Sequence, residues 1–158
     1  MGQAIAGRGW NLVYGGAHVG LMGAMADAAL AHGGSVTGVI PQDLVKREFA
    51  HRGLTQLIEV GTMHERKAEM ARCADAFLVL PGGLGTLDEM CEILTWSLLG
   101  IHEKPVVLIN VAGYWDPFLG MLDAAVAAGF LRPAHRSLPL LARDAEEACM
   151  TVEMSGKW

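Results

Sequence analysis

The sequence has few of the features that mark secreted, membrane-inserted or disulfide-stapled proteins. It contains only three cysteines, Cys73, Cys91 and Cys149, with no Cys-x-x-Cys pair, so we expect reduced thiols. No apolar run reaches the roughly 20 residues that a membrane-spanning helix requires. The first residues lack the basic start, apolar core and small-residue cleavage site of a signal peptide. These absences together predict a cytoplasmic protein that does not enter a membrane.

Positive charge is also scarce. Lysine and arginine number 12 against 17 aspartates and glutamates, which gives a formal net charge of −5 without any basic tract. A nucleic-acid polymer is therefore not an expected partner. The six histidines are scattered and form no His-x-x-x-His pair, so no zinc site is predicted. Binding of a small anion at a local cationic spot remains compatible with this composition.

Short apolar runs alternate with amphipathic segments along the 158 residues, which predict a single domain over 1–158. The predicted strands cover 11–14, 35–40, 56–60, 76–80, 105–110 and 138–141, and the wholly apolar run 76–80 predicts a central strand. The predicted helices cover 20–32, part of 42–52, 62–74, 85–99, 116–128 and 145–150, with Thr62 and Asp116 as N-caps. This alternation is typical of an α/β fold with a doubly wound, mostly parallel, Rossmann-like sheet. Residues 1–9 resemble the end of a helix, so we expect the sheet to lack its first strand in this chain.

Two glycine-rich loops follow predicted strands, where ligands of such sheets bind. One covers 15–23, and the other is the segment 81–86, Pro-Gly-Gly-Leu-Gly-Thr. In the second loop, glycines let backbone N–H groups approach an anion, Thr86 adds a hydroxyl, and a helix N-terminus adds partial positive charge. The alternative is a tight turn without a ligand. Three glycines and a threonine in this position favour the anion site.

Two helices carry charged residues beside an apolar stripe. Glu89 projects between the directions of Ile93 and Trp96, where a carboxylate is costly unless it is functional or paired. The alternative is an ordinary first-turn glutamate favoured by the helix dipole. Arg66 and Lys67 flank the apolar stripe of the helix over 62–74 and suit a phosphate or carboxylate partner. The alternative there is snorkelling side chains with solvated heads. Spacing alone does not separate these alternatives.

The helix over 86–99 has apolar residues around most of its circumference and so predicts a homodimer or larger homo-oligomer. Thr95 faces away from Glu89 and would then reach the site of a neighbouring subunit. The alternative is burial within the chain, under the segment 114–128 or under a missing N-terminal segment. The apolar residues are Leu87, Met90, Cys91, Ile93, Leu94, Trp96, Leu98 and Leu99.

Four segments of the chain carry distinctive motifs: YGGAHVGLMG (14–23), MHERK (63–67), PGGLGTLDE (81–89) and LTWSLLGIHEKPV (94–106). Together they resemble the LONELY GUY (LOG) family of cytokinin riboside 5′-monophosphate phosphoribohydrolases. The resemblance covers nearly the whole chain to about residue 145. It implies release of adenine-type bases from N6-substituted adenosine 5′-monophosphates, with ribose 5-phosphate as the other product and without metal or cofactor. The chain departs from the family at Ala17, where a third glycine is usual, and in lacking the opening strand with its Gly-Ser loop.

The resemblance also implies roles for individual residues. Arg66 and Glu89 match the catalytic pair of the family. The substrate-binding residues that it implies are Lys67, Gly83, Gly85 and Thr86 at the phosphate, with Gly82 in the same loop, and Glu48 and Thr95 as further contacts. Taken without the resemblance, Glu48 is an ordinary solvated charge. An anion such as Glu89 near the ribose C1′ would stabilise an oxocarbenium-like transition state.

Three other functions are alternatives to phosphoribohydrolase activity. The first is a broader nucleosidase that acts on AMP and other purine monophosphates. The second is a nucleotide- or cofactor-binding carrier on the same fold that catalyses nothing. A carboxylate beside a phosphate site disfavours the carrier, because binding a phosphate needs no carboxylate. The third, lysine decarboxylase, is a label often given to this family, and the sequence disfavours it because no pyridoxal-phosphate lysine context is visible.

Overall fold

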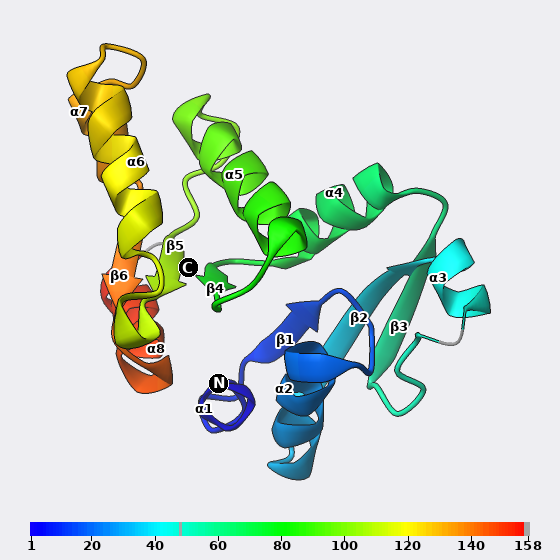
Figure 1. Ribbon diagram of the computed structural model, residues 1–158. Helices are drawn as coiled ribbons and strands as arrows, with labels where there is room; N and C mark the ends of the chain where they lie inside the picture. Colours follow the sequence, from blue (N-terminus) through cyan, green and yellow to red (C-terminus); the bar gives the residue numbers. More distant parts are fainter. Residues whose placement is uncertain (48, 157–158) are drawn as a thin grey trace. The chain divides into compact units, whose positions relative to one another are not determined.

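The computed structural model describes residues 1–47 and 49–156 of the chain. These residues form two compact units, the first ending at Ala74 and the second beginning at Asp75. Both units are of the α/β kind and each contains one parallel sheet (Figure 1). No helix within the described ranges has the length and apolar character needed to cross a membrane.

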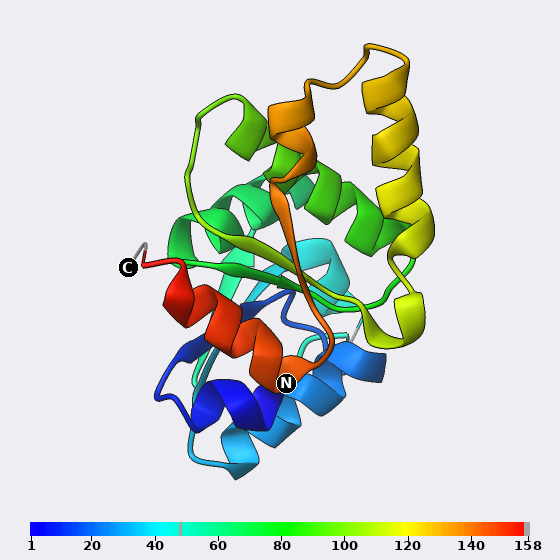
Figure 2. The ribbon, with the colours of Figure 1, turned by 90° about the vertical axis from the view of Figure 1, so that its left-hand side faces the viewer.

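The first unit contains a three-stranded parallel sheet in the order β1-β2-β3. Its strands are β1 (Asn11–Tyr14), β2 (Ser35–Pro41) and β3 (Gln56–Val60). Its helices are α1 (Gly2–Ala6), α2 (Gly20–Ala31), α3 (Gln42–Lys46) and α4 (Met63–Cys73). The two views place α2 and α4 on opposite sides of this sheet (Figures 1 and 2). Strand β2 is consequently covered on both faces, and Val36, Val39 and Ile40 have no exposed surface.

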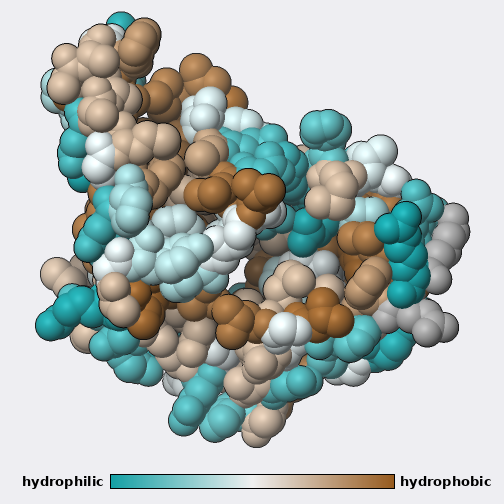
Figure 3. Space-filling model, viewed as in Figure 1, coloured by the Kyte–Doolittle hydropathy of each residue, from teal (hydrophilic) through white to brown (hydrophobic). Residues whose placement is uncertain are grey.

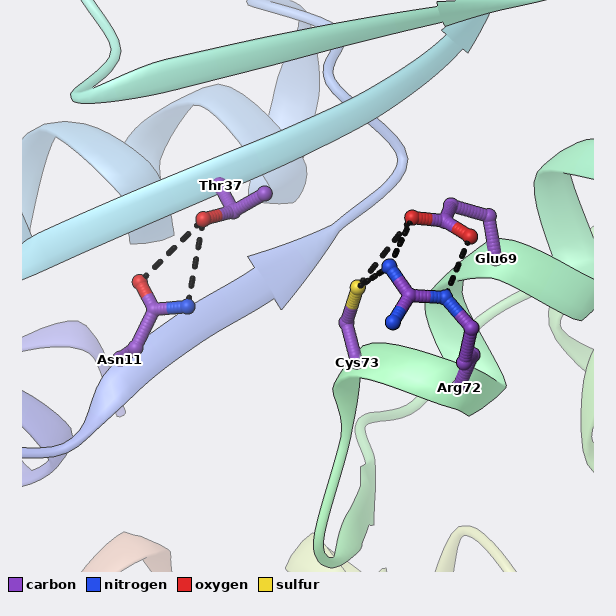
Figure 4. A network of polar contacts seen from close by, with 5 residues as sticks. All are labelled: Asn11, Thr37, Glu69, Arg72 and Cys73. Carbon is purple, nitrogen blue, oxygen red and sulfur yellow. Dashed lines mark hydrogen bonds and ion pairs between the residues drawn. The ribbon is translucent and has the colours of Figure 1, made fainter.

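Two sets of side-chain hydrogen bonds in this unit link neighbouring strands and the last turn of α4 (Figure 4). The Asn11 amide donates to the hydroxyl of the buried Thr37 over 3.2 Å and so joins β1 to β2. On the surface of α4, the guanidinium of Arg72 donates to Glu69, and the thiol of Cys73 donates to the same carboxylate over 3.5 Å. The Glu69 carboxylate thus links the side chains of Arg72 and Cys73 in the last turn of α4.

The start of α4 agrees with the sequence prediction. The hydroxyl of Thr62 accepts a hydrogen bond from the backbone N–H of Glu65 at 3.1 Å, so Thr62 is the N-cap. The Glu65 carboxylate in turn accepts from the Gly61 N–H at 2.7 Å, which resembles a capping box. Met63, the first residue of α4, is exposed, and the buried residues of this helix are Arg66 and Ala71.

The second unit also contains a three-stranded parallel sheet, in the order β4-β5-β6. Its strands are β4 (Phe77–Val79), β5 (Val106–Ile109) and β6 (Pro139–Ala142). Its helices are α5 (Leu84–Leu98), the 3₁₀ turn η1 (Val111–Gly113), α6 (Asp116–Ala127), α7 (Pro133–Arg136) and α8 (Ala145–Met154). Helices α5 and α8 lie on opposite sides of the sheet (Figure 2). Every residue of the central strand β5 is buried.

The α/β class and the parallel strands are confirmed, and all six predicted strands are present. The described strands form two three-stranded sheets, where the sequence predicts one doubly wound sheet. The apolar segment 76–80 was expected to be a central strand, but β4 pairs only with β5 among the described residues and is half-buried. Asp116 is the first residue of α6, and the N-cap is Trp115, one residue before the predicted one. The Asp116 carboxylate accepts a hydrogen bond from the Asn110 amide at 2.8 Å.

Candidate active site

Arg66 is a charged residue of the first unit whose side chain is buried. It lies in the first turns of α4 and is only 9% exposed. Its Nε donates a hydrogen bond to the backbone carbonyl of Val39 in β2 over 3.2 Å. A guanidinium keeps its charge in every protein environment, so burying it is costly without hydrogen-bond partners. The carbonyl of β2 therefore both stabilises the side chain and fixes its direction.

Gly15, the residue that follows β1, lies directly against this guanidinium. A Cβ placed on Gly15 would come within 1.8 Å of Nη2 of Arg66 and 2.9 Å of its Cζ. The end of β1, the middle of β2 and the start of α4 thus meet at one arginine. The sequence left open whether Arg66 is a snorkelling side chain with a solvated head. That alternative is wrong, because Arg66 is buried. Lys67, its neighbour, is half-buried.

The glycine-rich loop after β1 is attached to the segment near residue 50. An antiparallel bridge joins Ala17 to Ala50, and the backbone N–H of His51 donates to the Gly16 carbonyl at 2.9 Å. The ring of His51 lies 2.9 Å from the carboxylate of Asp27. Glu48, which the resemblance places at the substrate, lies outside the described residues. The contacts described above involve Ala50 and His51, which follow Glu48 in the chain.

Tyr14 holds the same loop through a hydrogen bond. It is buried at the end of β1, and its hydroxyl donates to the carbonyl of Ala17 over 3.2 Å. Burial, aided by the negative charge of Asp27, raises the pKa of the Tyr14 phenol to about 12. The phenol accordingly remains a neutral hydrogen-bond donor well above physiological pH.

The second glycine-rich loop lies in the second unit, between β4 and α5. Gly83 is the N-cap residue of α5 and has extended dihedral angles, and no side chain caps the helix there. The first backbone N–H groups of a helix have no partner within the helix. A Cβ on Gly83 or Gly85 would meet nothing within 4 Å. Neither glycine is therefore required by packing in this unit, which is consistent with space kept for a ligand.

Two side chains hold this loop. A Cβ on Gly82 would come within 2.1 Å of the Thr86 hydroxyl oxygen, so the threonine covers the turn closely. The hydroxyl of Tyr114 donates to the Gly82 carbonyl at 2.7 Å. Tyr114 itself lies in the loop after β5, where Ala112 and Gly113 both have positive φ angles. The loop is thus supported from its own helix and from the next strand.

Glu89 and Thr95 lie on α5. Glu89 is half-buried, while its neighbour Asp88 is exposed. Thr95 is exposed, and its hydroxyl donates to the carbonyl of Cys91 in the same helix at 2.7 Å. In the described ranges, no three His, Cys, Asp or Glu side chains come together in a group that could hold a metal ion.

Sequence reasoning placed Gly15 in the first glycine-rich loop without giving it a role beside Arg66, and it missed the Val39 carbonyl and Tyr114. The carbonyl has no sequence signal, because any residue type would supply it. Tyr114 follows a buried strand in the same way as the two glycine-rich loops, and this position was its only signal. Whether its hydroxyl reaches Gly82 depends on the backbone turn at Ala112 and Gly113.

The fold and these loops define an α/β protein with features of anion-binding proteins: a buried arginine and a glycine-rich turn that opens a helix. Solved structures share this fold. The molybdenum cofactor carrier protein of Chlamydomonas reinhardtii is 25% identical, with a TM-score of 0.71, over 97% of this chain and 81% of that one. The molybdenum cofactor binding protein of Rippkaea orientalis is 24% identical, with a TM-score of 0.69, over 98% and 82%.

Curated relatives are much closer in sequence. The cytokinin riboside 5′-monophosphate phosphoribohydrolase of Rhodococcoides fascians is 51% identical over 96% of this chain and 77% of its own length. The probable enzyme LOGL9 of Oryza sativa subsp. japonica is 52% identical over 97% and 67%, and the rice enzyme LOG is 48% identical over 97% and 63%. A family model described as "Possible lysine decarboxylase" matches residues 22–152.

The chain therefore belongs to the family of cytokinin riboside 5′-monophosphate phosphoribohydrolases, as its motifs predict. Its class is that of hydrolases acting on N-glycosyl bonds. The family model and these relatives differ in the activity they name. The relatives, at about half identity over nearly the whole chain, are the more specific comparison.

Proposed function

We propose that this protein hydrolyses the N-glycosidic bond of N6-substituted adenosine 5′-monophosphates, giving a cytokinin base and ribose 5-phosphate. The observation that carries the proposal is the buried Arg66, held by Val39 and Gly15, in a chain about half identical to phosphoribohydrolases. A permanently charged group in a fixed place suits a phosphate or the departing base. Oxygen from water becomes bonded to C1′, the C1′–N bond breaks, and the base leaves with a proton.

The phosphate-binding part of the proposal assigns four residues of one loop and one lysine. Gly83 and Gly85 allow the backbone N–H groups at the start of α5 to approach the phosphate, and Thr86 adds its hydroxyl. Gly82 shapes the turn beneath Thr86, and Lys67 supplies a further positive charge. Binding energy from the phosphate, far from the bond that breaks, positions the ribose.

The chemical part assigns Glu89, Arg66 and two further contacts. The Glu89 carboxylate stabilises the positive charge that develops at C1′ when the base departs. Arg66 holds the phosphate or assists departure of the base. Glu48 and Thr95 contact other parts of the substrate. The proposal includes no metal and no organic cofactor, as the resemblance to the family implies.

The remaining alternatives are a broader AMP nucleosidase and a carrier without turnover. The similarity to molybdenum cofactor carrier and binding proteins concerns the fold, at 24–25% identity. The carrier is disfavoured by the combination of Glu89 and Arg66, because a carrier has no transition state to stabilise.

Free base released from three compounds distinguishes these functions. Purified protein is incubated with an N6-substituted AMP, with AMP and with adenosine, and the products are separated by chromatography. The proposal expects rapid release from the substituted nucleotide and poor release from adenosine. Equal rates with AMP would identify the broader nucleosidase, and no release from any compound would identify the carrier.

We also propose that the protein forms a homodimer or larger homo-oligomer through α5 and the turn that follows it. Leu98 and Leu99 are exposed at the end of this helix, and Ile101 follows at 63% exposure. Hydrophobic surface lies near this end of α5 in the space-filling view (Figure 3). A second copy of the chain would remove this apolar surface from water.

A further inference from the structure

We infer that Gly15 is a positioning residue for Arg66: its missing side chain leaves the space that the guanidinium occupies. This inference rests on the proposed function insofar as it concerns catalysis. The three atoms nearest to a Cβ on Gly15 all belong to Arg66, namely Nη2 at 1.8 Å, Cζ at 2.9 Å and Nε at 3.3 Å. Among the described residues, and chain neighbours apart, no other residue has an atom nearer to this position than 3.3 Å.

The backbone conformation of Gly15 does not itself call for glycine. Its neighbour Gly16 has a φ of +73°, which disfavours any L side chain, whereas Gly15 is absent from the residues with positive φ. Alanine at position 15 would therefore be free of backbone strain. Apart from its chain neighbours, the three nearest atoms to the added methyl group all belong to Arg66, so the requirement for glycine is one of space for that side chain.

The arginine has little freedom to avoid an added methyl group. Ordinary van der Waals contact begins at 3.4 Å, so Nη2 would have to retreat by well over an ångström from a Cβ on Gly15. The Nε–H of the same guanidinium is bonded to the Val39 carbonyl. A retreat of the guanidinium therefore displaces the charge or breaks this bond. Misplacing a reacting or binding group by about 1 Å can cost about 100-fold in rate.

A double-mutant cycle on stability tests the spatial part without any assay of activity. We expect Gly15→Ala to lower the thermal unfolding midpoint of the wild type, and to lower it far less when Arg66→Ala has already emptied the space. Gly34→Ala is the matched control. A Cβ there would meet the side chain of Ala6 at 2.7 Å, far along the chain from Arg66, so its effect should be equal in both backgrounds. Equal losses for Gly15→Ala in both backgrounds would overturn the inference.

Activity tests the positioning part. We expect Gly15→Ala to lower kcat/KM for the nucleotide about 100-fold, while Gly34→Ala, assayed below its unfolding midpoint, changes it little. Millimolar guanidinium, far below denaturing concentrations, should restore part of the activity of Arg66→Ala but not of the double variant, because the added methyl group fills the vacated place. Rescue of both variants alike would contradict the positioning role.

The two proposals fail in different ways. If Arg66→Ala keeps wild-type activity, the catalytic role of Arg66 is wrong, yet the stability cycle still decides whether Gly15 accommodates its side chain. If Gly15→Ala does not fold, the double variant should fold again, and its failure to do so would count against the inference.

Discussion

The Nε of Arg66 lies 3.2 Å from the carbonyl oxygen of Val39 and donates a hydrogen bond to it. The contact joins the first turns of α4 to the middle of β2, and it directs a buried cation instead of leaving it in solvent. Because β2 is covered on both faces, its carbonyl is a rigid acceptor. The geometry of this cation can therefore be tested by substitutions that alter one contact at a time.

Replacing Glu89 by glutamine should abolish turnover while leaving nucleotide binding nearly unchanged. The amide keeps the size of the side chain but loses the negative charge that stabilises the oxocarbenium-like transition state. Single-turnover assays with the substituted nucleotide measure the effect, and the adjacent, exposed Asp88→Asn is the control. If Glu89→Gln kept more than about a tenth of the wild-type kcat, under roughly 1.4 kcal/mol of barrier, the catalytic assignment would be wrong.

Arg66→Ala should lose activity and also bind phosphorylated substrates more weakly. The variant removes the buried charge that we assign to the phosphate or to the departing base. Titration calorimetry with AMP, compared with adenosine, separates the two effects. For the unmutated protein we expect adenosine to be a poor substrate. Hydrolysis of adenosine as fast as AMP would show that the phosphate is not an anchor.

Tyr114→Phe should raise KM for the nucleotide several-fold with a smaller change in kcat. The variant removes one neutral hydrogen bond, to the Gly82 carbonyl, worth about 1 kcal/mol or less at this exposed position. The affinity for a nucleoside without phosphate serves as the internal control. An equal loss of affinity for nucleotide and nucleoside would indicate that Tyr114 does not act through the glycine loop.

Alkaline pH should destabilise the protein through Tyr14. Its pKa is raised to about 12 in the folded state, above the ordinary value near 10, so the neutral phenol stabilises the fold below pH 10. This contribution is lost as the pH rises from about 10 to 12. Denaturant unfolding of the wild type and Tyr14→Phe across this interval tests the effect. Parallel curves for the two proteins would contradict it.

Leu99→Glu should shift the protein toward a monomer if α5 forms the proposed interface. Leu99 is 63% exposed, so a charge there costs the single chain little but cannot be buried against a second copy. Met154→Glu is the matched control, since Met154 is 86% exposed on α8. Light scattering at micromolar concentration measures the mass. A monomeric wild type would refute the proposed oligomer.

The sequence by itself determined the α/β class, the order of the six strands along the chain and the residues that the resemblance implies at the site. Each depends on local patterns: apolar periodicity, the Thr62 cap, and the glycines of the second loop. Such patterns are encoded within a few residues, and so they survive without knowledge of distant neighbours.

Only the tertiary structure decided where Arg66 places its charge, and which groups hold it. Helical spacing left open whether this arginine is solvated or buried, because both put it beside the same apolar stripe. The outcome depends on Val39 and Gly15, which are 27 and 51 residues away along the chain and act through a carbonyl and a missing side chain. The carbonyl has no sequence pattern because every residue has one, and the glycine pattern of the first loop does not show which side chain packs against Gly15.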